Sequence, residues 1–97
     1  MSVSLSTHVL DTERGLPAIG VRVSLYRVGE LLTQRETDAD GRVADLAEEL
    51  EPGVYQLVFH PPSPYFRCVE LELVLEDGHH HVPLLVSSHA CVTYRGS

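Results

Sequence analysis

Apolar and polar side chains alternate with a period of two through most of this chain, and this alternation restricts the fold more than any other feature. The clearest run is Val69–Leu75, in which glutamates alternate with leucine and valine. The run from residue 3 to residue 10 places valines and a leucine on one face, and its other face carries Ser4, Ser6 and His8. Because successive side chains of a strand point to opposite faces, each run predicts a strand with one buried face.

Turn residues separate these runs at intervals of about eight to twelve residues, which is typical of an all-β sandwich. We expect strands over residues 3–10, 20–28, 31–37, 54–59, 69–75, 79–86 and 89–95. Residues 44–50 favour a short helical turn by composition. Residues 1–97 therefore predict a single domain, an antiparallel β-sandwich. The alternation alone does not choose among the β folds of this kind.

The charge balance argues against some classes of partner. The net charge is −7, and all seven basic residues are scattered arginines, so nucleic acid and anionic membranes are poor partners. No apolar run reaches the length of a membrane span, and the N-terminus shows no basic-then-apolar signal, so we expect a cytoplasmic protein. Cys68 and Cys91 lie 23 positions apart without a C-x-x-C motif. We expect two reduced, mostly buried thiols rather than a disulfide framework.

Three consecutive histidines precede the last strands. His79 and His81 are two residues apart and share one face of a strand, whereas His80 points the other way. A shared face suits zinc if His8 or His89 adds a third ligand, but no H-E-x-x-H motif supports a metal site. The alternative is a solvated histidine cluster, and His8 alone is most simply a solvent-facing residue. In the functional interpretation these imidazoles transfer protons near neutral pH.

Two arginines and the terminal serine are further candidates for the site. Arg42 follows the tight turn Asp38-Ala39-Asp40-Gly41, and a guanidinium held near histidines forms an anion site. Arg95 has the same potential. Ser97 carries both a hydroxyl and the terminal carboxylate, which could orient a histidine ring. No Gly-x-Ser-x-Gly motif occurs, which disfavours a covalent mechanism.

Three stretches together resemble one known family. They are "STHVLDTERGLPAIGVRVSLYR", "TDADGR" and "HHHVPLLVSSHACVTYRGS", and they look like the signatures of the transthyretin-related 5-hydroxyisourate hydrolases. The match runs in order from about Leu5 to Ser97. The terminal Tyr-Arg-Gly-Ser is the specific part, because the transthyretins that carry thyroid hormones are similar in fold but lack it.

The resemblance implies a prealbumin-like, transthyretin-like sandwich of seven to eight strands. It also implies a homotetramer, a dimer of dimers with active sites at the dimer–dimer interface. The implied reaction is hydrolysis of 5-hydroxyisourate to 2-oxo-4-hydroxy-4-carboxy-5-ureidoimidazoline in urate degradation, by attack of water on a ring amide without metal or organic cofactor. Position by position, the resemblance assigns catalysis to His8, Arg42, His81 and Ser97. It assigns substrate binding to the same four residues and to Tyr94, Arg95 and Gly96.

The chain also departs from the family pattern. His80 replaces a tyrosine, and residues 87–93 lack a proline and an aromatic residue. The strand at Val69 follows Tyr65-Phe66 almost at once, so we expect the family's helix to be short or absent. Two other functions fit the same resemblance: a transthyretin-like carrier of a small ligand, and a homologue whose catalytic site has decayed. The sequence leaves open whether His8 or His81 is the general base.

Overall fold

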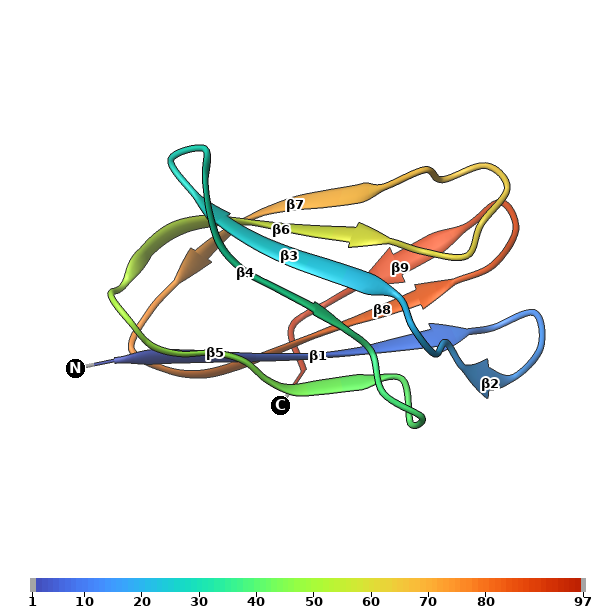
Figure 1. Ribbon diagram of the computed structural model, residues 1–97, viewed down its shortest axis with the longest axis horizontal. Coiled ribbons are helices and arrows are strands. Elements are labelled where there is room, and N and C mark those ends of the chain that lie inside the picture. The colour runs from blue at the N-terminus through green and yellow to red at the C-terminus, as the bar shows by residue number, and fades with distance from the viewer. Residues whose placement is uncertain (1, 97) are drawn as a thin grey trace.

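The computed structural model describes residues 2–96, which form a two-layer β-sandwich (Figure 1). Its strands are β1 (Val3–Asp11), β2 (Leu16–Pro17), β3 (Arg22–Arg27), β4 (Glu30–Glu36), β5 (Arg42–Leu50), β6 (Gly53–His60), β7 (Val69–Leu75), β8 (Gly78–Val86) and β9 (Cys91–Thr93). In one sheet β1 pairs with β8, and β8 pairs with β9. Strands β5 and β2 both pair with the other edge of β1. The second sheet has the order β4-β3-β6-β7.

The core lies between the two sheets and is built by the alternation seen in the sequence. The buried side chains of its central strands are Val3, Leu5 and Val9 of β1, Val23 and Leu25 of β3, Tyr55, Leu57 and Phe59 of β6, and Val82, Leu84 and Val86 of β8. Each large apolar side chain buried in this way contributes about 1.5–3 kcal/mol. The predicted β-sandwich is confirmed. No helix occurs among residues 2–96, which confirms that the family's helix is absent, and no membrane-spanning helix is found there.

One strand pair departs from the antiparallel arrangement and positions the site. Strands β1 and β8 run parallel, in an unbroken register from Val3 opposite Gly78 to Asp11 opposite Val86. The buried Thr7 hydroxyl donates to the carbonyl oxygen of Val82 at 2.6 Å within this pair. The register leaves the polar faces of the two strands side by side on the outside of the sandwich.

The expected helical turn at residues 44–50 is wrong, because this segment belongs to β5. Its pairing with β1 is irregular: Thr7 lies opposite Val43, Leu5 opposite Ala47, and Val3 opposite Leu50. The extra residues on β5 are β-bulges, which interrupt strict alternation. As a result the side chains that face the core are spaced by three and four residues, a spacing that imitates the face of a helix.

Two smaller expectations also need correction. The last strand spans only Cys91–Thr93, not residues 89–95. Both cysteines are free, but Cys68 is exposed and Cys91 is half-buried, so the expectation of mostly buried thiols is wrong.

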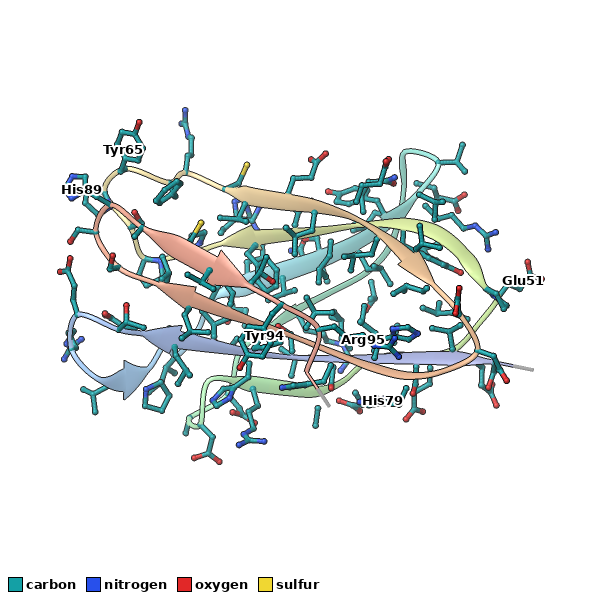
Figure 2. The ribbon with its side chains drawn as sticks, turned by 180° about the vertical axis from the view of Figure 1, so that it is seen from behind. Glu51, Tyr65, His79, His89, Tyr94 and Arg95 are labelled. Atoms are coloured by element: carbon teal, nitrogen blue, oxygen red, sulfur yellow. The ribbon has the colours of Figure 1, made fainter. Side chains whose placement is uncertain are left out.

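A short loop connects β6 to β7. Ser63 donates its hydroxyl to the carbonyl of Ser88 at 3.0 Å, which ties this loop to the one between β8 and β9. The Tyr65 and His89 rings lie 5.7 Å apart between centroids, and Figure 2 shows them together at one end of the sandwich. The two loops therefore support each other.

The turn before β5 depends on a glycine. Gly41 is buried with φ +75°, and a Cβ atom there would lie 2.5 Å from the carbonyl oxygen of Val9. The Val9 amide also donates to the Gly41 carbonyl at 2.7 Å. This contact between β1 and the turn leaves no room for a side chain.

We expect Gly41→Ala to destabilise the fold more than Gly29→Ala. Gly29 has φ +76°, but a Cβ atom there would meet nothing within 4 Å, so this variant isolates the backbone strain of about 1–2 kcal/mol. The clash at Gly41 adds about 1–3 kcal/mol to the same strain. Thermal unfolding of both variants measures the difference, and equal losses would contradict the close approach.

Candidate active site

Polar and ionisable side chains gather on the outer face of β1, β5 and β8. The parallel register puts Ser4 opposite His79 and Ser6 opposite His81, and His8 of β1 lies opposite Arg42 of β5. His8 and His81 are half-buried, whereas Arg42 and His79 are exposed. Three strands that are remote in sequence thus bring together three of the predicted site residues: His8, Arg42 and His81.

His80 points away from this cluster, as the alternation predicts. Its side chain is only 4% exposed. Its Nε2 lies 2.8 Å from the carbonyl oxygen of Glu76, so that nitrogen carries a proton and donates it. His80 therefore has a structural hydrogen bond in place of a role in the cluster.

The ring of His8 is held by the turn that precedes β5. Its Nε2 lies 2.9 Å from the carbonyl oxygen of Asp40. A carbonyl oxygen can only accept a hydrogen bond, so Nε2 carries the proton, and neutral His8 has its lone pair on Nδ1. This arrangement leaves Nδ1 able to accept a proton.

Asp38 organises the same turn. Its Oδ1 accepts hydrogen bonds from the backbone amides of Arg42 at 3.0 Å and Asp40 at 2.9 Å. These two amides, that of Arg42 first, hold the pKa of the Asp38 carboxyl below its usual range. Asp38 thereby fixes both the carbonyl that holds His8 and the backbone of Arg42. Sequence reasoning did not include it in the site, although its place at the start of an Asp-x-Asp-Gly turn was a signal.

Two serines connect the histidines of β8. Ser4 Oγ lies 2.7 Å from His79 Nδ1, and Ser6 Oγ lies 2.9 Å from His79 Nε2. Ser6 Oγ also lies 2.8 Å from Nδ1 of His81. Sequence reasoning treated both serines only as polar neighbours of His8. Their spacing of two residues along β1 was the available signal.

The pKa of His81 lies below the ordinary imidazole value. Partial burial is the main cause, and the electrostatic effect of the nearby His8, Arg42 and His79 adds to it. His81 is therefore neutral near neutral pH. Ion pairs among residues 2–96 join Arg27 to Glu51 and Arg35 to Asp45, so the described carboxylates leave the guanidinium of Arg42 free to bind an anion.

The C-terminal segment reaches this cluster through Gly96. Its amide donates to the carbonyl oxygen of His81 at 2.6 Å. A Cβ atom on Gly96 would lie 2.7 Å from Cδ2 of the His81 ring, so only glycine allows this approach. Figure 1 shows the chain turning away at the end of β9, and the described part ends with Gly96 bridged to His81 of β8. Ser97 lies outside the described residues.

Tyr94 and Arg95 have a different environment. Both are exposed, and they line a groove of about 410 Å³ together with β7, His80 and Val82. His80 and Val82 are core-facing residues of β8, so this groove opens between the edges of the two sheets. Within one chain the structure therefore does not bring Tyr94 and Arg95 to the face that carries His8 and His81. Figure 2 labels both residues on the segment that follows β9.

The geometry of the described residues does not support the zinc hypothesis. Residues 2–96 contain no group of three or more histidine, cysteine, aspartate or glutamate side chains placed to hold a metal ion. The cluster instead offers a proton acceptor on His8, a neutral imidazole on His81 and a cation on Arg42. These groups suit general acid–base chemistry on an anionic substrate.

Comparison with known proteins assigns the chain to a family. Residues 5–96 match the model of the HIUase/Transthyretin family. The chain belongs to this family. It is 39% identical to the 5-hydroxyisourate hydrolase of Pseudomonas aeruginosa, over 96% of this chain and 90% of that protein.

Solved structures of the HIUase/Transthyretin type agree. The Klebsiella pneumoniae 5-hydroxyisourate hydrolase is 38% identical, with a TM-score of 0.91 over 100% of both chains. Sea bream transthyretin in complex with thyroxine has a TM-score of 0.83 over 95% of this chain and 93% of its own. At 24% identity this second likeness concerns the fold alone.

We expect the pKa of His81 to lie below the ordinary imidazole value of 6.5, and Arg42→Gln to raise it by removing a positive charge. Histidine NMR titration of the wild type and the variant measures both values. Arg35→Gln is the control, because Arg35 lies on β4, pairs with Asp45 and is not among the groups that act on His81. An unchanged His81 pKa in Arg42→Gln would contradict the electrostatic coupling.

The sign for stability follows from the same shift. The unfolded chain binds the His81 proton at a higher pH than the folded chain does. Stability contributed through His81 is therefore present above the ordinary imidazole pKa and falls as the pH drops toward the lower folded value. Arg42→Gln should narrow the pH range over which this stability is lost, because it brings the folded pKa of His81 closer to the unfolded value.

Proposed function

We propose that this chain is a 5-hydroxyisourate hydrolase of urate degradation, which opens a ring amide to form 2-oxo-4-hydroxy-4-carboxy-5-ureidoimidazoline. The observation that supports this most is the convergence of His8, Arg42 and His81 on one sheet face, with Gly96 against His81. Relatives at 39% and 38% identity that bear this enzyme name support the choice of substrate.

His8 is the general base in this proposal. Its Nε2–H donates a hydrogen bond to the Asp40 carbonyl, which leaves Nδ1 as the proton acceptor. Nδ1 takes a proton from water as the water oxygen bonds to the substrate carbonyl carbon. Held by its hydrogen bond, the ring keeps the correct tautomer without a carboxylate partner. The proton on His8 returns to solvent after the ring has opened.

Arg42 holds the anionic substrate and offsets the charge that develops on the carbonyl oxygen. Its planar fork suits two oxygens at once, which a lysine would not match. When the carbon–nitrogen bond breaks, the nitrogen takes the electron pair and needs a proton. Neutral His81 supplies it from Nε2, since its Nδ1 faces Ser6.

The C-terminal segment completes the site in this proposal. Gly96 brings the chain against the His81 ring. Binding of the substrate or a histidine by the Ser97 hydroxyl and carboxylate stays a prediction from the family resemblance. Substrate contacts by Tyr94 and Arg95 stay a prediction from the family resemblance. We also keep the cytoplasm as the proposed compartment, and no cofactor enters the reaction.

We propose that the site is closed by a second copy of the chain, in a homotetramer built as a dimer of dimers. In one chain Arg42 and His79 stay exposed, so an added surface is needed to shield the substrate from water. Leu16 and Ile19, on and after β2 beside this face, are 49% and 67% exposed. Such apolar residues at the rim of a site suit contact with a symmetry-related copy.

Hydrolysis is tested by following the decay of 5-hydroxyisourate made from urate by urate oxidase. His8→Ala should lower turnover by about 10²–10⁴-fold, the usual contribution of a general base, with an unchanged melting temperature. His89→Ala, which removes a histidine from the β8–β9 loop, should keep full activity. A His8→Ala variant at full rate would remove His8 from the mechanism, and an inactive wild type would refute the proposed function.

Assembly is tested by sedimentation. We expect the wild type to sediment as a tetramer and Ile19→Asp to shift toward smaller species, because a charge cannot be buried there without a partner. Val28→Asp is the matched control, since Val28 is 92% exposed in the β3–β4 turn. A monomeric wild type would contradict a site shared between copies.

A further inference from the structure

His79 lies in the cluster but has no part in the reaction as described so far. It is joined to both serines of β1, and through Ser6 it is joined to His81. The three contacts form one unbroken chain, Ser4–His79–Ser6–His81, with distances of 2.7, 2.9 and 2.8 Å. The parallel register creates it, because Ser4 and His79 are opposite each other, as are Ser6 and His81.

Proton counting leaves two arrangements once the buried Ser6 hydroxyl must donate within the chain, because the contacts of Ser6 Oγ among residues 2–96 are those to His79 and His81. Each hydroxyl has one proton, and each neutral imidazole has one N–H, so each contact has a single donor. In the first arrangement Ser4 donates to His79 Nδ1, His79 Nε2 donates to Ser6, and Ser6 donates to His81 Nδ1. His81 then carries its proton on Nε2. In the second arrangement every donor is reversed, and Nε2 of His81 carries none.

The first arrangement suits the role of His81. Because burial, with His8, Arg42 and His79 nearby, lowers the pKa of His81 and keeps the ring neutral, it has no second proton to give. A neutral imidazole that lost its only proton would become an anion. It avoids this charge only if another proton reaches Nδ1 as Nε2 releases one, and Ser6 is the group at hydrogen-bond distance from Nδ1.

We propose that Ser6, His79 and Ser4 are positioning residues: Ser6 fixes the tautomer of His81, and the three together resupply its proton along this chain. As Nε2 of His81 gives its proton to the leaving nitrogen, Ser6 passes one to Nδ1. His79 passes its Nε2 proton to Ser6, Ser4 passes its proton to His79 Nδ1, and water returns one to Ser4. One proton enters at Ser4 and one leaves at His81. The chain resets when Nε2 takes a proton from solvent and Ser4 loses one.

The position of each end supports this direction. Ser4 and His79 lie toward the exposed part of the cluster, where water can supply a proton, whereas Ser6 is 7% exposed. At the other end, Nε2 of His81 neighbours Cδ2 in the ring, and Cδ2 faces Gly96. The nitrogen that is not bound to Ser6 therefore lies on the side of the C-terminal segment. The charged or titratable groups acting on His81 are His8 of β1, Arg42 of β5 and His79 of β8.

The inference rests on the proposed hydrolysis for its catalytic part, but the tautomer can be measured without substrate. Long-range ¹H–¹⁵N spectra of histidine-labelled protein, above the pH at which His81 titrates, report which ring nitrogen carries the proton. The wild type should show one His81 tautomer with the proton on Nε2. Ser6→Ala should give a mixture, and Ser6→Thr, which keeps the hydroxyl, should restore the single tautomer. A mixture in the wild type, or no change in Ser6→Ala, would overturn the proposal.

Turnover then separates the relay from a simple hydrogen bond. Ser6→Ala should lower kcat by at least about tenfold, but by less than the loss of about 10²–10⁴-fold expected for removing a general acid. His79→Ala keeps the Ser6–His81 contact, so it should preserve the tautomer and still lower kcat. Ser24→Ala removes another buried serine hydroxyl, on β3, and should change neither the His81 tautomer nor kcat. A His79→Ala variant with full kcat would overturn the relay. If the wild type has no hydrolase activity, the tautomer measurements still decide the positioning role.

Discussion

The parallel, in-register pairing of β1 with β8 is the constraint on which the rest of the site depends. The two strands are about 75 residues apart in the chain, yet they match at every position from Val3 to Asp11. A slip by one residue would turn every side chain of one strand to the opposite face. Buried residues on both strands prevent that slip, since it would move Leu5 or Leu84 out of the core. The same packing that excludes water from the sandwich therefore aligns two serines with two histidines on its outside.

The site is also an electrostatic exception in an acidic protein. With a net charge of −7, most of the surface repels anions, but the outer face of β1, β5 and β8 concentrates Arg42 and three histidines. The nearby Asp38 carboxylate accepts hydrogen bonds from the backbone amides of Asp40 and Arg42 and in this way orders the turn beside Arg42. A local cation in such a field attracts an anionic substrate to one place on the protein. Burial, together with these neighbouring groups, lowers the pKa of His81 and keeps it neutral, and a neutral imidazole needs a hydroxyl partner to act as an acid.

Much of this could be read from the sequence, and the failures have definite causes. The strand Val69–Leu75 was predicted with its correct bounds, because its alternation is uninterrupted. Residues 44–50 were misread because bulges in β5 replace alternation with a helix-like spacing, and bulges depend on the partner strand. His8, Arg42 and His81 were found through family signatures. Ser6 and Asp38 were missed because a serine or an aspartate on a polar face is ordinary until the pairing shows what lies opposite it.

The departures from the family pattern fall together in space, and this bears on whether the site has decayed. The missing helix leaves a short loop after β6, and the altered residues after Val86 form the loop between β8 and β9. Ser63 bonds to Ser88, and Tyr65 lies against His89, so each altered loop supports the other. Figure 2 shows Tyr65 and His89 at one end of the sandwich and His79 toward the other. Loops tolerate such exchange because few core contacts cross them. Decay of the site would instead remove its own contacts, yet the hydrogen bonds of His8, His79 and His81 and the close approach of Gly96 are all present.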